Sequence, residues 1–267
     1  MKFRKIKFAF VAMAVLSMLL PTSAGLTVSG AIFGGVASPG RELVHEIDVS
    51  IEEDASPVNV TIDVFGFAMN SRGSKIKLKP EEDTGPYSAR AFLTVTPKSF
   101  QLQPGVPQKI LVKAEFPEDV GTGGRYALVT ITSEPEVTKE RVKSASSIQV
   151  PVLLLIDGTE IVETGEIADL EGSESDDGVV VSLMFENTGN YHYKSIANSV
   201  LKNQDGEILA TSPPLQSSSS VLPTGSWLFR MKLVPESELV QGTYTIEASV
   251  TNEVGTVLDS EETTIKI

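Results

Sequence analysis

Histidines and serines are the side chains of this sequence that could support proton transfer or nucleophilic attack. The sequence holds two histidines, His45 and His192, and no cysteine. A serine nucleophile needs a histidine and a carboxylate in a fixed mutual geometry, and no local spacing around either histidine indicates one. His45 falls in the apolar row of an alternating segment, whereas His192 stands between two tyrosines just after a turn. We interpret His45 as a packed or edge histidine and His192 as part of a surface aromatic cluster, and we predict that the chain is not an enzyme.

Acidic side chains gather in short runs that could bind a hard cation. The runs are residues 52–54, 81–83 and 171–177. Calcium prefers several oxygens that converge in one loop. Asp176-Asp177-Gly178 is the best candidate, but the twelve-position calcium-loop pattern is absent, as is a glycine loop that could cradle phosphate. We interpret the runs as solvated turns and predict no metal and no cofactor.

The first 24 residues have the features of an export signal. Four cations within the first seven positions precede an apolar run at 8–20, and small residues follow at 22–24. This arrangement is typical of a cleaved secretory signal, and the apolar run is shorter than the roughly 20 residues that span a bilayer. An uncleaved N-terminal anchor is the alternative, and it would be the chain's link to a membrane. We predict an extracytoplasmic protein, located in the periplasm, at the cell surface or in the medium.

The chain is acidic. Its net charge is −13, and loss of the four leader cations takes it to about −17. Repulsion of like charges disfavours binding to nucleic acids and to anionic lipids. The absence of cysteine excludes a disulfide-braced scaffold and a cysteine-linked lipid anchor. Stability must therefore come from hydrophobic cores, which domains of about 100 residues can build.

One spacing occurs twice. Pro117 precedes Tyr126 by nine positions, Pro235 precedes Tyr244 by nine positions, and a glycine lies two positions before each tyrosine. Recurrence at a fixed spacing indicates a duplicated structural unit. In immunoglobulin-like sandwiches a tyrosine early in a strand pins the preceding corner by a hydrogen bond to backbone a few residues upstream. We predict this structural corner role for Tyr126 and Tyr244.

The rest of the chain reads as strands and turns. Apolar and polar residues alternate in nearly every segment, with turn residues at short intervals and no convincing helix. This pattern predicts an all-β protein of two tandem immunoglobulin-like antiparallel sandwiches. Residues 70–86, which are polar and rich in glycine and proline, are expected to form a long loop. The predicted organisation is a signal peptide at 1–24, a lead segment at 25–40, a first domain at 41–160 and a second at 161–267.

The segment at residues 147–156 is the candidate binding element. Ile148, Val150, Val152 and Leu154 alternate along it, and Pro151 lies inside it. A proline removes a ladder donor, so the strand should lie at a sheet edge or carry a bulge. An apolar edge strand is either covered or available for pairing with another chain. We predict that these four residues bind a partner; the alternative is the last core strand of the first domain, packed against the second.

Two families of extracytoplasmic proteins resemble this chain. The resemblance covers residues 41–157 and is carried by the segments 57–64 and 99–105 and by the run from Phe116-Pro117-Glu118 to Gly124-Arg125-Tyr126. These segments look like the first domain of periplasmic pilus-assembly chaperones, and also like the peptidoglycan-binding module associated with WxL cell-surface proteins. The chaperone resemblance implies a second immunoglobulin-like domain. It further implies that the last strand of the first domain offers alternating apolar residues to a subunit that lacks a strand.

Three functions remain open at this point. The first is a non-enzymatic binding protein that captures a surface or secreted protein subunit, in the manner of a chaperone, by pairing along the edge at 147–156. The second is a binding or structural module of the cell envelope that engages a wall polymer or an S-layer. The third is a hydrolase hidden in the sandwich loops, against which the two histidines and the lack of metal-ligand spacing argue.

Overall fold

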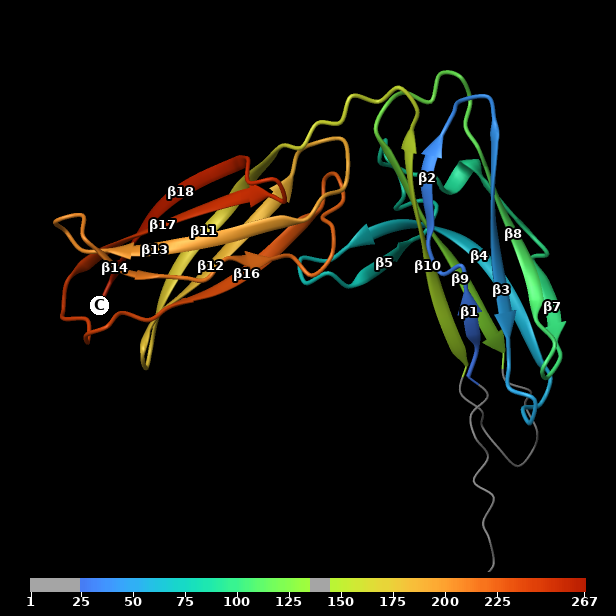
Figure 1. The fold of residues 1–267 in the computed structure, drawn as a ribbon, viewed down its shortest axis with the longest axis horizontal. Helices are drawn as coiled ribbons and strands as arrows, with labels where there is room; N and C mark the ends of the chain where they lie inside the picture. The colour runs from blue at the N-terminus through green and yellow to red at the C-terminus, as the bar shows by residue number, and fades with distance from the viewer. Residues whose placement is uncertain (1–24, 135–144) are drawn as a thin grey trace, which may run out of the picture.

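The structure, a computed structural model, describes residues 25–134 and 145–267. The predicted signal peptide at 1–24 lies outside the described residues and stays a prediction. Two β-sandwiches follow one another along the chain (Figure 1). The described residues contain one helical element, the short 3-10 helix η1 (Arg90–Phe92), and among them there is no helix long and apolar enough to cross a membrane. The all-β prediction is confirmed.

The first sandwich packs two sheets face to face. One sheet has the strand order β1-β3-β8-β6, and the other has the order β2-β10-β9-β4-β5, with β7 paired to β4. The strands are β1 (Thr27–Ser29), β2 (Phe33–Ala37), β3 (Glu42–Ser50), β4 (Val58–Met69), β5 (Lys75–Leu78), β6 (Leu93–Thr96), β7 (Ser99–Leu102), β8 (Gln108–Glu115), β9 (Gly124–Glu134) and β10 (Ser146–Ile156).

The second sandwich repeats the plan with fewer strands. Its sheets have the orders β11-β12-β16 and β14-β13-β17-β18, with β15 paired to β13. The strands are β11 (Gly165–Ser175), β12 (Gly178–Asn187), β13 (Ser195–Lys202), β14 (Ile208–Thr211), β15 (Leu215–Gln216), β16 (Ser226–Leu233), β17 (Thr243–Asn252) and β18 (Val257–Lys266).

The two sandwiches share a pairing scheme. The β3–β8 pair of the first corresponds to the β12–β16 pair of the second. The run β4-β9-β10 corresponds to β13-β17-β18, all antiparallel. The corners between β8 and β9 and between β16 and β17 therefore occupy equivalent places, and each carries the recurring proline and tyrosine of the sequence.

Each sandwich has its own core. Alternation along the strands sends one row of side chains inward, so the first core is built from buried residues between Phe33 and Ile156 and the second from residues between Ile167 and Ile265. Residues 157–164 connect β10 to β11. The division of the chain at residues 160 and 161 falls in this connection and stays a prediction.

Residues 25–40, expected as a lead segment, form part of the first sandwich. They contain β1, which pairs with β3, and β2, which pairs in parallel with β10. Phe33 and Ala37 are buried in the first core. The sequence pattern hides β2 because two glycines interrupt its alternation, and its partner strand lies more than a hundred positions away.

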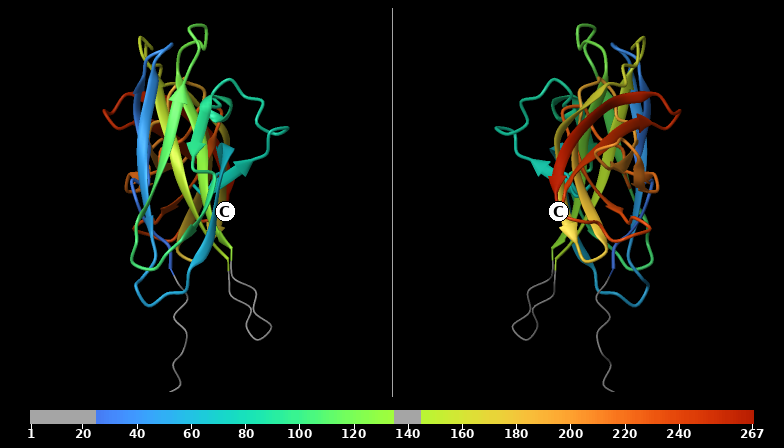
Figure 2. Two further views of the ribbon diagram at one scale, coloured as in Figure 1. Left: turned by 90° about the vertical axis from the view of Figure 1, so that its right-hand side faces the viewer. Right: turned by 90° about the vertical axis from the view of Figure 1, so that its left-hand side faces the viewer.

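Residues 70–86, expected as a long loop, include a strand. β5 pairs with the last four residues of β4 and makes a hairpin that bends away from the first sandwich toward the second (Figure 1). Asn70 closes the turn, since its side-chain oxygen accepts from the backbone N–H groups of Arg72 and Ser74. Figure 2 shows this part of the chain, in teal, standing out from the side of the first sandwich.

Candidate functional site

The outer edge of β10 is half covered. β2 pairs with residues 152–156, whereas no strand of the described residues pairs with the outer side of residues 146–151. Pro151 stands where the coverage ends, directly before the first residue paired to β2. A proline cannot donate to a ladder, which accounts for the end of the β2 pairing at this residue.

Two backbone hydrogen bonds determine which backbone groups face outward at this open edge. Ile156 donates its N–H to Gly123 O on the β9 side at 3.1 Å, and Asp157 donates to Ala37 O on the β2 side at 3.0 Å. Because successive residues of a strand direct these groups to alternate sides, Ser147, Gln149 and Pro151 direct theirs outward. The open edge therefore presents the N–H groups of Ser147 and Gln149, and no donor at Pro151.

The predicted partner-binding side chains belong to the row of β10 that faces the first core. Val150, Val152 and Leu154 are 0% exposed in the first core, and Ile148 is partly buried. The apolar alternation that singled them out thus marks the row that packs against the opposing sheet. Val150, Val152 and Leu154 are therefore enclosed in the core, whereas the backbone edge of β10 is accessible at residues 146–151; the partner-binding role of the four residues stays a prediction.

The outward row of β10 is partly exposed. Ser147 is exposed, Gln149, Leu153 and Leu155 are intermediate, and Pro151 is buried. Leu155 lies beside Val36 of β2, whose side chain is 56% exposed. The outer face beyond the open edge therefore mixes apolar and uncharged polar groups.

A lysine from the hairpin reaches the open edge. Lys75, the first residue of β5, donates from Nζ to Gln149 O at 3.5 Å. The two residues are 74 positions apart in the sequence. The contact brings the β4–β5 hairpin over the outer face of β10, and it supplies a cation beside a strand that has none of its own.

The two sandwiches meet at the β8–β9 corner. Gly124 donates its backbone N–H to Asn190 O at 2.8 Å, and the Tyr126 hydroxyl lies 3.2 Å from His192 Nδ1. Tyr87 donates its hydroxyl to Gly189 O at 3.4 Å. The hydrogen bond expected from Tyr126 to the backbone upstream is therefore replaced by one that links the two domains.

Burial sets the ionisation of this junction. Desolvation lowers the pKa of His192 to about 4, so the ring is neutral near pH 7. Desolvation also raises the pKa of the Tyr126 hydroxyl, so that group stays protonated. The ring of Tyr126 stands edge-on to His192 at a centroid distance of 5.6 Å, and Tyr191 packs at 4.1 Å. The expected aromatic cluster around His192 thus exists, but it lies between the domains.

A buried arginine supplies hydrogen bonds to the backbone at the β8–β9 corner of the first sandwich. Arg125 is 3% exposed, and its guanidinium donates to the carbonyl oxygens of Val120, Thr122 and Gly124. Burial lowers its pKa. None of the ion pairs of the described residues includes Arg125, and its protein hydrogen-bond acceptors are these backbone carbonyls.

The β4–β5 hairpin makes a second contact between the domains. Leu228 of β16 donates its N–H to Ser71 O at 2.7 Å. Gly73 has a φ of +82°, and a Cβ there would lie 2.6 Å from the Trp227 ring. Trp227 is therefore both a residue of the second core and a contact of the hairpin.

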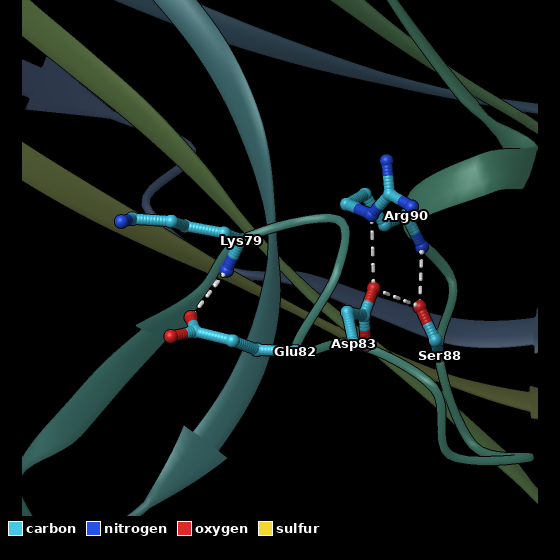
Figure 3. A network of polar contacts seen from close by, with 5 residues as sticks. All are labelled: Lys79, Glu82, Asp83, Ser88 and Arg90. Carbon is cyan, nitrogen blue, oxygen red and sulfur yellow. Dashed lines mark hydrogen bonds and ion pairs between the residues drawn. The ribbon is translucent and has the colours of Figure 1, made fainter.

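A polar network holds the segment that follows β5 (Figure 3). Asp83 accepts from Ser88 Oγ at 2.6 Å and from Arg90 Nε at 3.0 Å. The Lys79 N–H donates to Glu82 at 2.9 Å. Asp83 packs against Gly66 of β4, where a Cβ would lie 2.3 Å from its carboxyl carbon. Two residues of the acidic run at 81–83, Glu82 and Asp83, thus have structural roles in the segment that follows β5.

Two further sequence candidates, His45 and Asp177, have structural partners. His45 stacks on Phe33 at 4.8 Å and its Nε2 lies 2.8 Å from Gly30 O. Asp177 of the acidic turn pairs with Lys232 at 2.6 Å. Within residues 25–134 and 145–267, no group of three or more acidic or histidine side chains is placed to hold a metal ion.

Sequence reasoning missed Lys75, Arg125 and the hairpin. The alternation of Lys75, Lys77 and Lys79 with two apolar residues was a signal for a short strand. The contact of Lys75 with β10 had no such signal, because it depends on the bend of β4. Arg125 stood inside the recurring corner motif, where the second copy has Thr243.

Comparison with known proteins finds no family model and no curated protein that matches the sequence. Among solved structures, a chain of the chaperone–tip adhesin complex of CFA/I fimbriae is similar with a TM-score of 0.47 and 11% identity, over 90% of this chain and 98% of that one. The Escherichia coli chaperone DraB has a TM-score of 0.43 and 12% identity, over 90% and 98%. A chain of the Salmonella enterica SafA pilin–SafB chaperone complex has 0.43 and 13%, over 92% and 98%. The structural neighbours of this two-sandwich chain thus include fimbrial chaperones.

Proposed function

We propose that this protein is an extracytoplasmic binding protein that captures an extended segment of another protein along the open edge of β10. The captured segment adds a strand beside residues 146–151 and is bound mainly through its backbone. The partner is a surface or secreted protein subunit. Binding requires no cofactor and no chemical step.

The open edge carries this proposal. Ser147 and Gln149 direct their N–H groups outward, with no strand of the described residues paired to them. Unpaired edge groups are a template for strand addition, and natural proteins usually cover or disrupt such edges. Here β2 covers the neighbouring residues of the same strand, so a captured segment would lie end to end with β2.

The edge is also held in place. β10 forms ten register pairs with β9, and its inward row is buried in the first core. A strand that is already ordered loses little conformational entropy when a partner pairs with it, which favours binding. The partner, in contrast, has to become ordered.

Replacement of Gln149 by proline tests the proposal. Gln149→Pro removes one outward N–H without removing a donor to β9, whereas Gln149→Ala changes the side chain and keeps the N–H. A photoreactive amino acid at Ser147 would cross-link a captured segment and identify it by mass spectrometry. We expect cross-linked partner with the Gln149→Ala protein and loss of it with Gln149→Pro, at equal thermal stability. Equal cross-linking in both proteins would show that backbone pairing at this edge is not the mode of capture.

A further inference from the structure

The β4–β5 hairpin is a cationic element in an acidic protein. Arg72, Lys75, Lys77 and Lys79 lie on it within eight positions, and all four are exposed. The chain as a whole has a net charge of −13. None of the five ion pairs found among the described residues includes any of these four cations. These four cations therefore have no carboxylate partner among the described residues.

Two of these cations lie over the outer face of the sheet that bears the open edge. Lys75 contacts Gln149 O of β10, and Lys77 Nζ lies 5.1 Å from the centroid of the Phe65 ring of β4. Lys75 and Lys77 share one face of β5 because side chains alternate along a strand. Asp63 and Glu134 stand at outward positions of β4 and β9, and neither forms an ion pair with these lysines.

We propose that this hairpin selects the captured segment by charge: the partner strand carries carboxylate side chains on the face that it turns toward Lys75 and Lys77. The inference rests on the proposed function, since it specifies what binds at the β10 edge. A strand paired beside residues 146–151 alternates its side chains between the core side and the outer side. Side chains on the outer side emerge beneath the hairpin. The edge itself has no charge along residues 145–156, so its backbone gives no preference among partners, and the lysines supply one.

The opposing interpretation is that Lys75 protects the edge. Lysines at sheet edges discourage unwanted pairing, and the Lys75 ammonium occupies the acceptor that a partner strand would use. The two interpretations predict opposite changes in binding when the charge of Lys75 is removed. If Lys75 selects a partner, loss of its charge weakens binding of acidic strands; if it protects the edge, loss of its charge strengthens binding of every strand and promotes self-association.

The experiment uses short peptides, acetylated and amidated so that carboxylates come from side chains alone. In three peptides valine alternates with glutamate, with serine or with lysine. Binding to the full mature chain is measured by isothermal titration calorimetry at low and at high salt. We expect the glutamate peptide to bind about fivefold or more tightly than the serine peptide at low salt, and the lysine peptide to bind weakest. High salt should remove the preference.

Charge-reversed variants assign the preference to the hairpin. Lys75→Glu/Lys77→Glu should abolish or invert the preference for the glutamate peptide. Lys98→Glu/Lys266→Glu, at two exposed lysines away from β5, changes the net charge equally and should keep it. If the control variant loses the preference as well, or if Lys75→Ala strengthens binding of all peptides, charge selection by the hairpin is wrong.

Failure of this inference is distinguishable from failure of the proposed function. Equal affinities for the three peptides, all lost in Gln149→Pro, would keep the edge as the binding site and reject charge selection. Affinities that do not change in Gln149→Pro, or the absence of binding by any peptide, would reject the edge itself and the inference with it.

Discussion

The corners of the two sandwiches have the same sequence spacing and different bonding. Tyr244 donates its hydroxyl to Val240 O at 2.8 Å, four residues upstream, and so pins its own corner. Tyr126 sits at the equivalent place in β9 and is equally buried, at 2% against 6% exposed, but its hydroxyl is bonded to His192 of the other domain. Tyr244 thus stabilises a corner within one domain, whereas Tyr126 links the two domains.

Arg125 makes this difference possible. Its guanidinium donates to three carbonyl oxygens of the first corner, whereas the aligned residue of the second corner is Thr243, which has no guanidinium. A corner needs some donor for carbonyls that the turn leaves without a strand partner. Once an arginine supplies it, the tyrosine hydroxyl is free for another acceptor. The two corners therefore differ at the position before the tyrosine, Arg125 against Thr243, and the tyrosine at the arginine-bearing corner links the two domains.

The largest effect is expected from removal of the arginine. Arg125→Met keeps an apolar stem but leaves the carbonyls of Val120, Thr122 and Gly124 without their donor; the Gly124 bond is buried and the other two are partly buried, so the loss of these donors is costly. We expect the free energy of unfolding of the first domain to fall by about 2–3 kcal/mol, measured by urea denaturation followed by circular dichroism. The matched change Thr243→Ala should alter the second domain by less than about 0.5 kcal/mol. Similar losses in both would mean that the two corners are held alike.

Substitution of the glycine two positions before each tyrosine should give the next largest difference in stability between the two corners. A Cβ at Gly124 would lie 1.9 Å from the Tyr126 hydroxyl, whereas a Cβ at Gly242 would meet its nearest atom, in the Tyr244 ring, at 3.7 Å. Gly124→Ala must displace Tyr126 from His192, and we expect it to cost about 2 kcal/mol. Gly242→Ala should be neutral within about 0.5 kcal/mol. Thermal unfolding of the two variants tests this, and a tolerated Gly124→Ala would show that the Tyr126 ring is not fixed in place.

The sequence could predict the architecture because its signals are local. Alternation and turn residues identify most strands, and the recurring spacing places Tyr126 and Tyr244 at the starts of equivalent strands, β9 and β17. The partner of the Tyr126 hydroxyl could not be predicted, because it lies 66 positions away in another domain. Nothing in the local pattern distinguishes a hydroxyl that bonds upstream backbone from one that bonds a distant side chain.

The candidate site was less predictable than the fold. Pro151 correctly suggested that part of β10 lies at an edge, since a missing donor is visible in the sequence. The alternation of Val150, Val152 and Leu154 could not say whether that row faces a core or a partner, because both environments select the same side chains. The coverage by β2 and the approach of Lys75 depend on pairings across the whole first domain, which no local pattern reports.

The tyrosine hydroxyls themselves give the next smaller effect. Tyr244→Phe leaves Val240 O without its donor and should lower the stability of the second domain by about 1 kcal/mol. Tyr126→Phe should leave the first domain unchanged within about 0.5 kcal/mol, because Arg125 holds that corner. It should, however, increase the hydrogen exchange of the Gly124 amide, which donates to Asn190 O across the junction. Equal stability losses in the two variants would contradict the division of roles between Arg125 and Tyr126.

The smallest effect is a pH dependence that the junction has and the second corner lacks. The pKa of His192 is lowered to about 4, while a free histidine has a pKa near 6.5, so separated domains take up a proton that the joined state does not. The junction is therefore unaffected by pH above about 7 and weakens as the pH falls through the window from 6.5 to 4. The hydroxyl of Tyr126 and the ring of Tyr191 face His192, and burial raises the pKa of the Tyr126 hydroxyl. From pH 7 to pH 6 we expect the free energy that joins the two domains to fall by an amount on the order of 0.5 kcal/mol, seen as faster Gly124 amide exchange after correction for the intrinsic rate.

The control is His192→Gln, which should remove this pH dependence, and the Tyr244 hydroxyl bond should show none in either protein. A wild-type junction that is equally protected at pH 7 and pH 5 would mean that His192 keeps enough solvent contact to titrate normally, and the hydroxyl bond to Tyr126 would then contribute little to joining the domains.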